Sequence, residues 1–178
     1  MNLIIKGKEL QLYFSREQLH DMVVKIANQI STDYKDKNPI FIGVLNGAFM
    51  FMSDLIRGVD PQIKFQIDFI KLSSYDGSQS TGIVKALSGL KNDIKGRNVI
   101  IVEDIIETGL TITAVIEEMK KLEPASIKLC ACFLKIGKQK INIKPDYLGT
   151  EIEDKFIIGY GLDWDEFGRG LDQLYYIL

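Results

Sequence analysis

The chain has 178 residues, of which 46% are hydrophobic and 26% charged, and its formal net charge is −2. We expect residues 1–178 to form a single domain, and the composition excludes a disordered chain. The small negative charge argues against a broad basic surface, so neither nucleic acid nor a membrane is expected as a partner. The start, MNLIIKGKELQLYF, lacks the apolar core of a signal peptide, and no apolar run approaches a membrane span. These features predict a cytoplasmic protein.

The cysteines and the one histidine offer little chemistry. Cys130 and Cys132 lie two residues apart in a hydrophobic run, so in a strand they share one face. A metal or redox pair is one interpretation, but no second Cys/His cluster completes a metal site, and small core residues are favoured. His20 lies among periodic helical residues and is expected on the surface or in the core.

A capping-box pattern opens the first predicted helix. Ser15 is followed three residues later by Gln18, a pair that satisfies backbone N–H groups at a helix start. Apolar residues then recur at helical spacing, which predicts an amphipathic helix over residues 16–30.

Strand patterns follow. Residues 39–45, PIFIGVL, form a continuous apolar run typical of a strand buried on both faces, and Asn46-Gly47 leads into a helix over 48–57. Residues 63–69 alternate between apolar and polar side chains. The alternation predicts a half-buried strand with an apolar face made of Ile63, Phe65, Ile67 and Phe69.

Residues 74–82, SYDGSQSTG, consist of turn formers apart from Tyr75 and Gln79. A long polar loop inside a compact domain predicts a lid or a binding loop. Downstream, a helix is expected over 111–122, with strands over 98–102, 126–134 and 155–160. Helices that alternate with buried strands indicate an α/β fold with a parallel sheet.

The segment Val99–Thr111, VIIVEDIIETGLT, carries the densest chemistry. Glu103 and Asp104 are expected at the carboxyl end of a buried strand, where open parallel sheets bind ligands. Adjacent carboxylates there accept hydrogen bonds from a sugar diol or hold a hydrated Mg²⁺. Thr108 to Thr111 then open a helix, whose free N–H groups and positive dipole end suit a phosphate.

Together these features predict a ribose-phosphate site. Gly109 allows close approach of the backbone, and the two threonines add hydroxyl donors. The alternative is an acidic helix start capped by threonine, because Asp and Glu are favoured at such ends. The full order of four apolar residues, two acids, two apolar residues, one acid and TGxT is more specific than TGxT alone.

This segment resembles the diphosphoribosyl-binding motif of the hypoxanthine-guanine phosphoribosyltransferases of purine salvage, and the resemblance runs through most of the chain. Leu45-Asn46-Gly47 is similar to the family's pyrophosphate loop, which has a non-proline cis peptide at the position of Leu45-Asn46. Ser74 and Tyr75 look like part of the mobile loop that closes over the reacting centre. Arg169 matches the pyrophosphate-binding arginine.

The resemblance extends to the purine site. Lys135 matches the lysine that reads the 6-oxo group, and residues 155–163 are similar to the purine-binding segment, which implies Phe156, Ile157 and Asp163 as base contacts. Taken singly, Lys135 is better interpreted as a solvated strand-end lysine, and Phe156 as a core residue. For Asp163 and Arg169 alone, a surface ion pair is the alternative. Their order and spacing alongside the 99–111 segment favour the site.

The resemblance implies a Rossmann-like core, a parallel sheet flanked by helices, with a small hood formed by the N- and C-terminal segments. It implies an enzyme that transfers the 5-phosphoribosyl group from phosphoribosyl pyrophosphate to hypoxanthine or guanine, as a homodimer or homotetramer. Mg²⁺ is the implied cofactor, with Glu103, Asp104 and Asp163 as metal ligands. The implied contacts of phosphoribosyl pyrophosphate are Leu45, Asn46, Gly47, Ser74, Tyr75, Glu103, Asp104, Glu107, Thr108, Gly109, Leu110, Thr111 and Arg169.

Three positions depart from the family pattern. Glu107 stands where the usual general base is aspartate, and we predict that Glu107 is the base despite its additional methylene. Leu110 stands where lysine is frequent, and Asn46 replaces a lysine of some relatives. Because backbone groups make those two contacts, we expect them to matter less.

Other functions remain open on the sequence. One is a regulator that binds the sugar diphosphate and RNA or DNA, which requires a basic face. Another is a sibling enzyme for xanthine or a pyrimidine, and the order of hypoxanthine, guanine and xanthine as substrates is also open. A generic nucleotide-binding module is disfavoured because the chain lacks GxGxxG and GxxxxGK.

Overall fold

The computed structural model describes residues 3–72 and 86–177 and contains two sheets. The larger has the strand order β4-β3-β5-β6-β7, and all of its neighbouring strands are parallel. Its strands are β3 (Ile40–Leu45), β4 (Gln66–Lys71), β5 (Asn98–Ile106), β6 (Ser126–Lys135) and β7 (Tyr147–Ile152). The expected α/β fold with a parallel sheet is confirmed.

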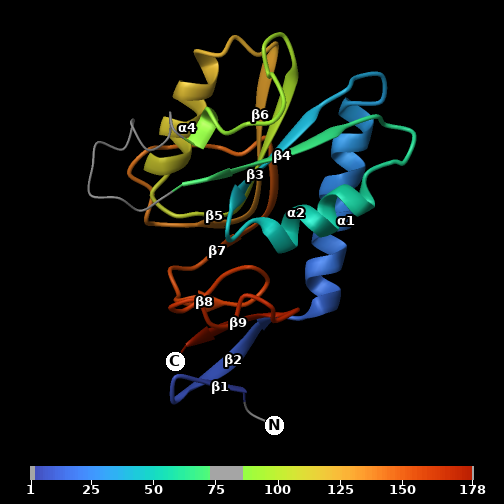
Figure 1. Cartoon of the computed structure of the whole chain (residues 1–178). Coiled ribbons are helices and arrows are strands. Elements are labelled where there is room, and N and C mark those ends of the chain that lie inside the picture. Colours follow the sequence, from blue (N-terminus) through green and yellow to red (C-terminus); the bar gives the residue numbers. More distant parts are fainter. Residues whose placement is uncertain (1–2, 73–85, 178) are drawn as a thin grey trace.

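Helices cover both faces of this sheet (Figure 1). Helices α1 (Arg16–Asp33) and α2 (Phe49–Gly58) pack on one face, and α4 (Leu110–Lys120) packs on the other. Neighbouring residues of the central strands enter opposite clusters: Phe41 packs with α1 and α2, whereas Ile40 and Ile42 pack with α4. The continuous apolar runs of the sequence therefore reflect strands buried on both sides.

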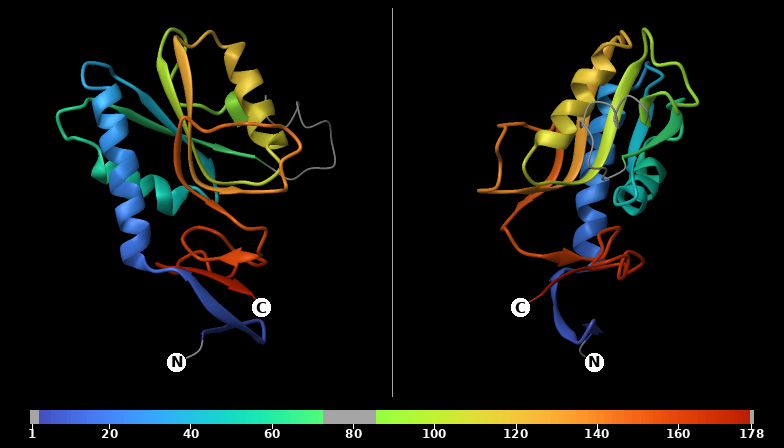
Figure 2. Two further views of the ribbon diagram at one scale, coloured as in Figure 1. Left: turned by 180° about the vertical axis from the view of Figure 1, so that it is seen from behind. Right: turned by 60° about the vertical axis from the view of Figure 1, so that its left-hand side comes forward.

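The smaller sheet is antiparallel and has the order β1-β2-β9-β8. It joins the two ends of the chain, since its strands are β1 (Leu3–Ile5), β2 (Lys8–Phe14), β8 (Ile157–Ile158) and β9 (Leu174–Ile177). Figure 2 shows this sheet below the larger sheet and its helices, and it contains β1 and β9, the first and last strands of the described residues. The hood expected from the N- and C-terminal segments is confirmed.

The first helix forms as its capping box predicts. The Ser15 side chain accepts a hydrogen bond from the Gln18 backbone N–H, and the Gln18 side chain accepts one from the Ser15 N–H at 2.9 Å. The helix continues past the predicted end at residue 30 to Asp33. Within the described residues, no helix is long and apolar enough to cross a membrane.

The half-buried strand predicted over 63–69 is wrong in its bounds and in its buried face. Strand β4 buries Asp68 and Ile70, which are 8% and 1% exposed, whereas Ile67 and Phe69 are 39% and 43% exposed. The Asp68 carboxylate accepts hydrogen bonds from the backbone N–H groups of Lys91 and Asn92 at 2.7 and 2.8 Å. A polar side chain thus occupies the inner position, and β4 lies at the edge of the sheet.

Two further strand predictions needed correction. Strand β5 extends beyond the predicted end at 102 to Ile106, because Glu103 to Ile106 continue to pair with β6. The strand expected over 155–160 is only Ile157–Ile158, because Gly159 and Tyr160 adopt φ angles of 107° and 50° that turn the chain. The sequence patterns missed β1, β2, β7 and β9.

The core interpretation of the cysteines is confirmed. Cys130 and Cys132 are fully buried on one face of β6, and both are free thiols. Burial raises the pKa of each thiol, so neither is poised as a nucleophile. His20 lies exposed on α1.

Candidate active site

A cavity of about 350 Å³ lies at the carboxyl end of β5, where the chain turns into α4. Its lining is made of Val44 and the residues of this turn, namely Glu103, Asp104, Ile105, Ile106, Glu107, Thr108, Gly109, Thr111 and Ile112. Six of the site residues predicted from the sequence therefore contribute to a single concave surface: Glu103, Asp104, Glu107, Thr108, Gly109 and Thr111.

The loop after β3 is packed tightly beside this cavity. The expected non-proline cis peptide between Leu45 and Asn46 is confirmed. A Cβ atom on Gly47 would overlap the Asp104 carboxylate, and one on Gly161 would overlap the Gly47 carbonyl oxygen. The loop is thus enclosed between β5 and a turn of the hood, and neither glycine position has room for a side chain.

Tyr160 connects the turn of the hood at residues 159–161, here called the hood turn, to the core. The Tyr160 hydroxyl donates a hydrogen bond to the Asp54 carboxylate of α2 at 2.9 Å, and the ring is 4% exposed. Burial is the main cause of a raised pKa at the Tyr160 hydroxyl. This contact holds Gly161 against the loop of residues 45–47.

Glu103 and Asp104 interact at the floor of the cavity. Burial and the adjacent Asp104 charge raise the pKa of the Glu103 carboxyl well above its usual range. Burial also raises the pKa of Asp104, against hydrogen bonds and the Arg169 charge, which lower it. The Asp104 carboxylate accepts the Ile105 backbone N–H at 2.7 Å. Two closely placed carboxyl groups in a partly dry site favour a cation or hydroxyl donors as their partner.

Asp163, the third predicted metal ligand, is engaged elsewhere. It forms an ion pair with Arg169 at 2.8 Å and accepts the backbone N–H of Glu166 at 2.7 Å. In the part of the chain that the structure describes, no three His, Cys, Asp or Glu side chains are placed to hold a metal ion. Mg²⁺ commonly binds through one or two carboxylates, waters and substrate phosphates, so Glu103 and Asp104 fit a Mg²⁺ ion shared with a substrate.

Arg169 is held by three contacts. Besides Asp163, it donates to the Gly161 carbonyl oxygen at 2.9 Å and to the Glu166 carboxylate at 3.4 Å. The ion pair between Asp163 and Arg169 that the sequence left open does form, but both side chains are largely covered, with exposures of 23% and 22%. Arg169 thus lies at the hood turn that contacts the 45–47 loop.

The turn before α4 has the form expected for anion binding. Gly109 is the N-cap of α4 with a φ angle of 78°, and the Thr108 hydroxyl accepts the backbone N–H of Leu110 at 3.3 Å, the threonine contact that the alternative interpretation expected. The first N–H groups of a helix have no intrahelical acceptor, so those that follow Leu110 are available to a phosphate. The Thr108 carbonyl accepts hydrogen bonds from the backbone N–H groups of Lys140 and Ile141 at 3.0 and 3.2 Å, which brace the turn.

Lys135 is not the solvated strand-end lysine of the alternative interpretation. Its side chain is 5% exposed, and its ammonium donates to a Glu107 carboxylate oxygen at 2.6 Å. The same ammonium lies 3.6 Å from the Asp154 carboxylate. Lys138 pairs with Asp154 at 2.9 Å and lies 4.0 Å from Glu107.

Lys138 and Asp154 were not singled out from the sequence. Asp154 lies two residues beyond β7, and the signal that would have found it is the pairing of β7 with β6, which places this segment beside Lys135. Since the pattern did not reveal β7, it gave no reason to connect the two residues.

The predicted purine contacts lie in the hood. Phe156 is 51% exposed, which excludes the core interpretation, and its ring meets Trp164 edge-on at 6.0 Å between centroids. Ile157 is buried in β8. Ser74, Tyr75 and the predicted lid at 74–82 lie outside the described residues.

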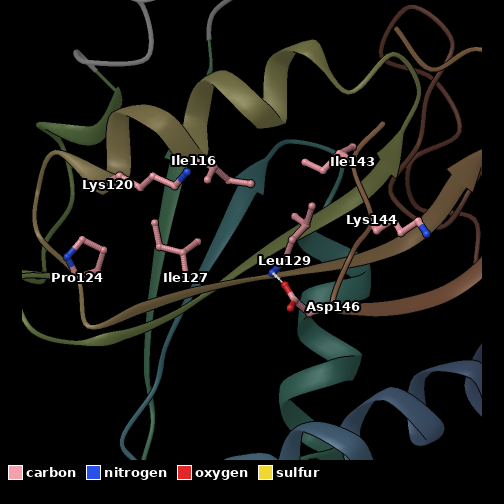
Figure 3. Close-up of a pocket in the computed structure, with 8 residues that line it drawn as sticks. All are labelled: Ile116, Lys120, Pro124, Ile127, Leu129, Ile143, Lys144 and Asp146. Carbon is pink, nitrogen blue, oxygen red and sulfur yellow. Dashed lines mark hydrogen bonds between the residues drawn. The ribbon is translucent and has the colours of Figure 1, made fainter. Parts of the chain in front are cut away.

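A second cavity of about 260 Å³ lies between α4 and the segment that precedes β7 (Figure 3). Its walls are mainly aliphatic, and the one carboxylate drawn there, Asp146, accepts the Leu129 backbone N–H at 2.8 Å. None of the residues predicted for the site lines it.

Comparison with known proteins gives a consistent result. Residues 15–165 match the phosphoribosyl transferase domain model. The chain is 37% identical to the hypoxanthine-guanine phosphoribosyltransferase of Aquifex aeolicus, with 97% of both chains covered. It is 38% identical to the hypoxanthine-guanine-xanthine phosphoribosyltransferase of Tritrichomonas foetus, with 90% of this chain and 87% of the relative covered.

A crystal structure of a hypoxanthine-guanine phosphoribosyltransferase from Bacillus anthracis has the same fold. It superposes with a TM-score of 0.85 at 35% identity and covers 96% of this chain and 99% of its own. Sequence and fold agree over nearly the whole length, and the resemblance seen in the motifs is confirmed. The chain belongs to the hypoxanthine-guanine phosphoribosyltransferase family.

Proposed function

We propose that this protein transfers the 5-phosphoribosyl group of phosphoribosyl pyrophosphate to hypoxanthine or guanine, giving IMP or GMP and pyrophosphate. The observation that supports this most directly is the pair formed by the buried ammonium of Lys135 and the Glu107 carboxylate, 2.6 Å apart. It sets a hydrogen-bond donor and a proton acceptor beside the phosphate-binding turn. The family's named activity supports the same assignment.

The sugar phosphate would occupy the cavity at the end of β5. The N–H groups at the start of α4 and the Thr108 and Thr111 hydroxyls would bind its 5-phosphate. Glu103 and Asp104 would accept hydrogen bonds from the ribose diol and hold Mg²⁺. When bound, Mg²⁺ would neutralise charge on the pyrophosphate as it leaves.

Departure of pyrophosphate breaks the bond from the anomeric carbon to oxygen and leaves negative charge on the leaving group. Arg169 and the backbone of residues 45–47 would stabilise that charge, because both are fixed before the reaction by the contacts around Gly47 and Gly161. Preorganised donors are effective since they need not reorient as charge develops.

The new bond forms between a ring nitrogen of the purine and the anomeric carbon. As this nitrogen attacks the anomeric carbon, it loses a proton, which Glu107 would accept. Lys135 would donate a hydrogen bond to the 6-oxo group, with Phe156 and Ile157 beside the base. Adenine presents a 6-amino donor at that position, so the Lys135 ammonium would face another donor and disfavour it.

A spectrophotometric assay with phosphoribosyl pyrophosphate, Mg²⁺ and each base in turn tests the proposal. Hypoxanthine and guanine should be converted, adenine should not, and the rate with xanthine ranks the third oxopurine. Turnover of adenine at a rate comparable to hypoxanthine, or conversion of no purine at all, would contradict it. We further propose a cytoplasmic homodimer or homotetramer, which light scattering after size-exclusion chromatography distinguishes.

A further inference from the structure

Four charged side chains alternate in sign where the ends of three neighbouring strands meet. Lys135 ends β6, Glu107 follows β5 by one residue, and Asp154 follows β7 by two. The nitrogen-to-oxygen distances around this charge ring are 2.6 Å for Lys135–Glu107, 3.6 Å for Lys135–Asp154, 2.9 Å for Lys138–Asp154 and 4.0 Å for Lys138–Glu107. The ring is neutral overall.

The members differ sharply in exposure. The Lys135 side chain is 5% exposed, whereas Glu107, Lys138 and Asp154 are 43%, 43% and 45% exposed. A buried ammonium needs a nearby anion, because an uncompensated buried charge is strongly unfavourable. The three exposed members can rearrange into water at little cost, but Lys135 cannot.

The proposed function requires this arrangement to change. In the ligand-free ring, Glu107 accepts the hydrogen bond from Lys135 at 2.6 Å. When it takes the proton of the purine and becomes neutral, it ceases to be the countercharge of Lys135. Lys135 must nevertheless stay charged and in place, since it donates to the 6-oxo group in the same step.

We propose that Asp154 is a positioning residue, held by Lys138, which supplies the countercharge of Lys135 while Glu107 acts as the base. This inference rests on the proposed function and adds to it a residue that touches neither substrate. Only Asp154, among the described carboxylates other than Glu107, lies within 4 Å of the Lys135 ammonium.

Lys138 suits the task of fixing Asp154. It lies nearer to Asp154 than to Glu107, and its hydrogen bond is the main cause of a lowered pKa at the Asp154 carboxyl. Asp154 therefore stays ionised when the proton of the purine arrives at Glu107. The neighbouring carboxylate, Glu153, pairs with Lys155 at 2.9 Å and takes no part in the ring.

The substitution Asp154→Asn tests this role against the matched control Glu153→Gln, which removes one charge from the adjacent residue. In Asp154→Asn, kcat/KM for hypoxanthine should fall by about tenfold or more, the scale on which misplaced site groups slow enzymes. The KM for phosphoribosyl pyrophosphate and the melting temperature should stay at the parent values. Asp154→Glu should recover most of the loss.

A second measurement, the affinity for IMP, tests the effect of Asp154 on Lys135 without turnover. Trp164 is the chain's one tryptophan and adjoins Phe156, so its fluorescence should report binding of IMP, which carries the 6-oxo group. Asp154→Asn should raise the Kd for IMP, whereas Glu153→Gln should leave it unchanged. A parent protein that binds IMP but converts no base would contradict the proposed function, while this comparison of Kd values still decides the role of Asp154.

Equal kcat/KM and equal IMP affinity in Asp154→Asn and Glu153→Gln would overturn the proposal. So would a loss in Asp154→Asn that extends to the KM of the sugar diphosphate and to the melting temperature, because that pattern indicates a general structural role.

Discussion

Lys135 and Glu107 meet at 2.6 Å although 28 residues separate them in the chain. The register of β5 and β6 explains the meeting: Ile106 pairs with Leu134, so the next residue of each strand emerges side by side. The two differ in environment, since Lys135 is buried and Glu107 is half-exposed. A fixed donor and a movable acceptor therefore stand together at the carboxyl edge of the sheet.

The substitution Lys135→Met should reduce use of hypoxanthine and weaken discrimination against adenine. Loss of a hydrogen bond to a charged group costs about 1.5–3 kcal/mol, which corresponds to roughly a ten- to hundredfold fall in kcat/KM. The fold should tolerate the change, because Glu107 retains access to water. The measurement is kcat/KM for both bases, together with the melting temperature.

Lys128→Met is the matched control for that variant, because Lys128 lies on the same strand and pairs with Asp146 at 2.6 Å away from the site. It should keep the parent ratio of hypoxanthine to adenine. An unchanged ratio in Lys135→Met would show that another group reads the 6-oxo position.

Gly47→Ala should raise the KM for phosphoribosyl pyrophosphate and lower stability. The new methyl group would overlap the Asp104 carboxylate, so either the loop or a predicted ligand of the sugar and Mg²⁺ must move. Such strain typically costs about 1–3 kcal/mol. Gly170→Ala is the control, since a Cβ at Gly170 meets nothing within 4 Å and should change neither quantity. Parent-like kinetics in Gly47→Ala would mean that the loop does not contact the sugar diphosphate.

Removal of divalent metal should abolish turnover. Excess EDTA should stop conversion of hypoxanthine, and added Mg²⁺ should restore it, because Glu103 and Asp104 offer an incomplete oxygen donor set that fits Mg²⁺ shared with substrate phosphates. Asp104→Asn should require more Mg²⁺ for half-maximal rate than the parent. Full activity in excess chelator would rule out the assigned metal.

Tyr160 should make stability fall at alkaline pH. Burial raises the pKa of its hydroxyl above the ordinary value near 10, so the unfolded chain releases the proton first and ionisation favours unfolding as the pH rises beyond that value. In Tyr160→Phe, urea unfolding should show a shallower loss of stability above about pH 10. At neutral pH the variant should lose about 1 kcal/mol with the Asp54 hydrogen bond. An identical alkaline slope would indicate that Tyr160 ionises freely.

Local signals were enough to predict the core of this fold. The capping box at Ser15 fixed the start of α1, and continuous apolar runs identified the strands that pack between two layers of helices. The alternation pattern predicted the wrong buried face for strand β4, because an inner position of this strand holds Asp68. The cost of burying Asp68 is offset by hydrogen bonds from residues 91 and 92. Only the tertiary structure supplies those donors.

The site residues likewise divide into those that the sequence predicted and those that only the tertiary structure revealed. Residues 103–111 are contiguous and most of them line one cavity, so their motif alone was enough to predict phosphate and diol contacts there. Asp154 and Lys138 come close to Lys135 and Glu107 through the pairing of β6 with β7, a contact between segments with no motif of their own. Arg169 was predicted from the sequence. Its hydrogen bond to the Gly161 carbonyl oxygen, and the close approach of Gly161 to the 45–47 loop, depend on the turn geometry of the hood.

The central claim is that Glu107 accepts the proton of the purine. Glu107→Gln retains the shape of the side chain and an acceptor for Lys135, while Asp154 still balances the lysine charge. Rapid-quench measurement of a single turnover with hypoxanthine isolates the chemical step. We predict a fall of about 10²–10⁴-fold with little change in the KM for phosphoribosyl pyrophosphate, and retained activity in Glu107→Asp. Single-turnover chemistry in Glu107→Gln at more than about half the parent rate would contradict the claim, since general base catalysis contributes far more than that.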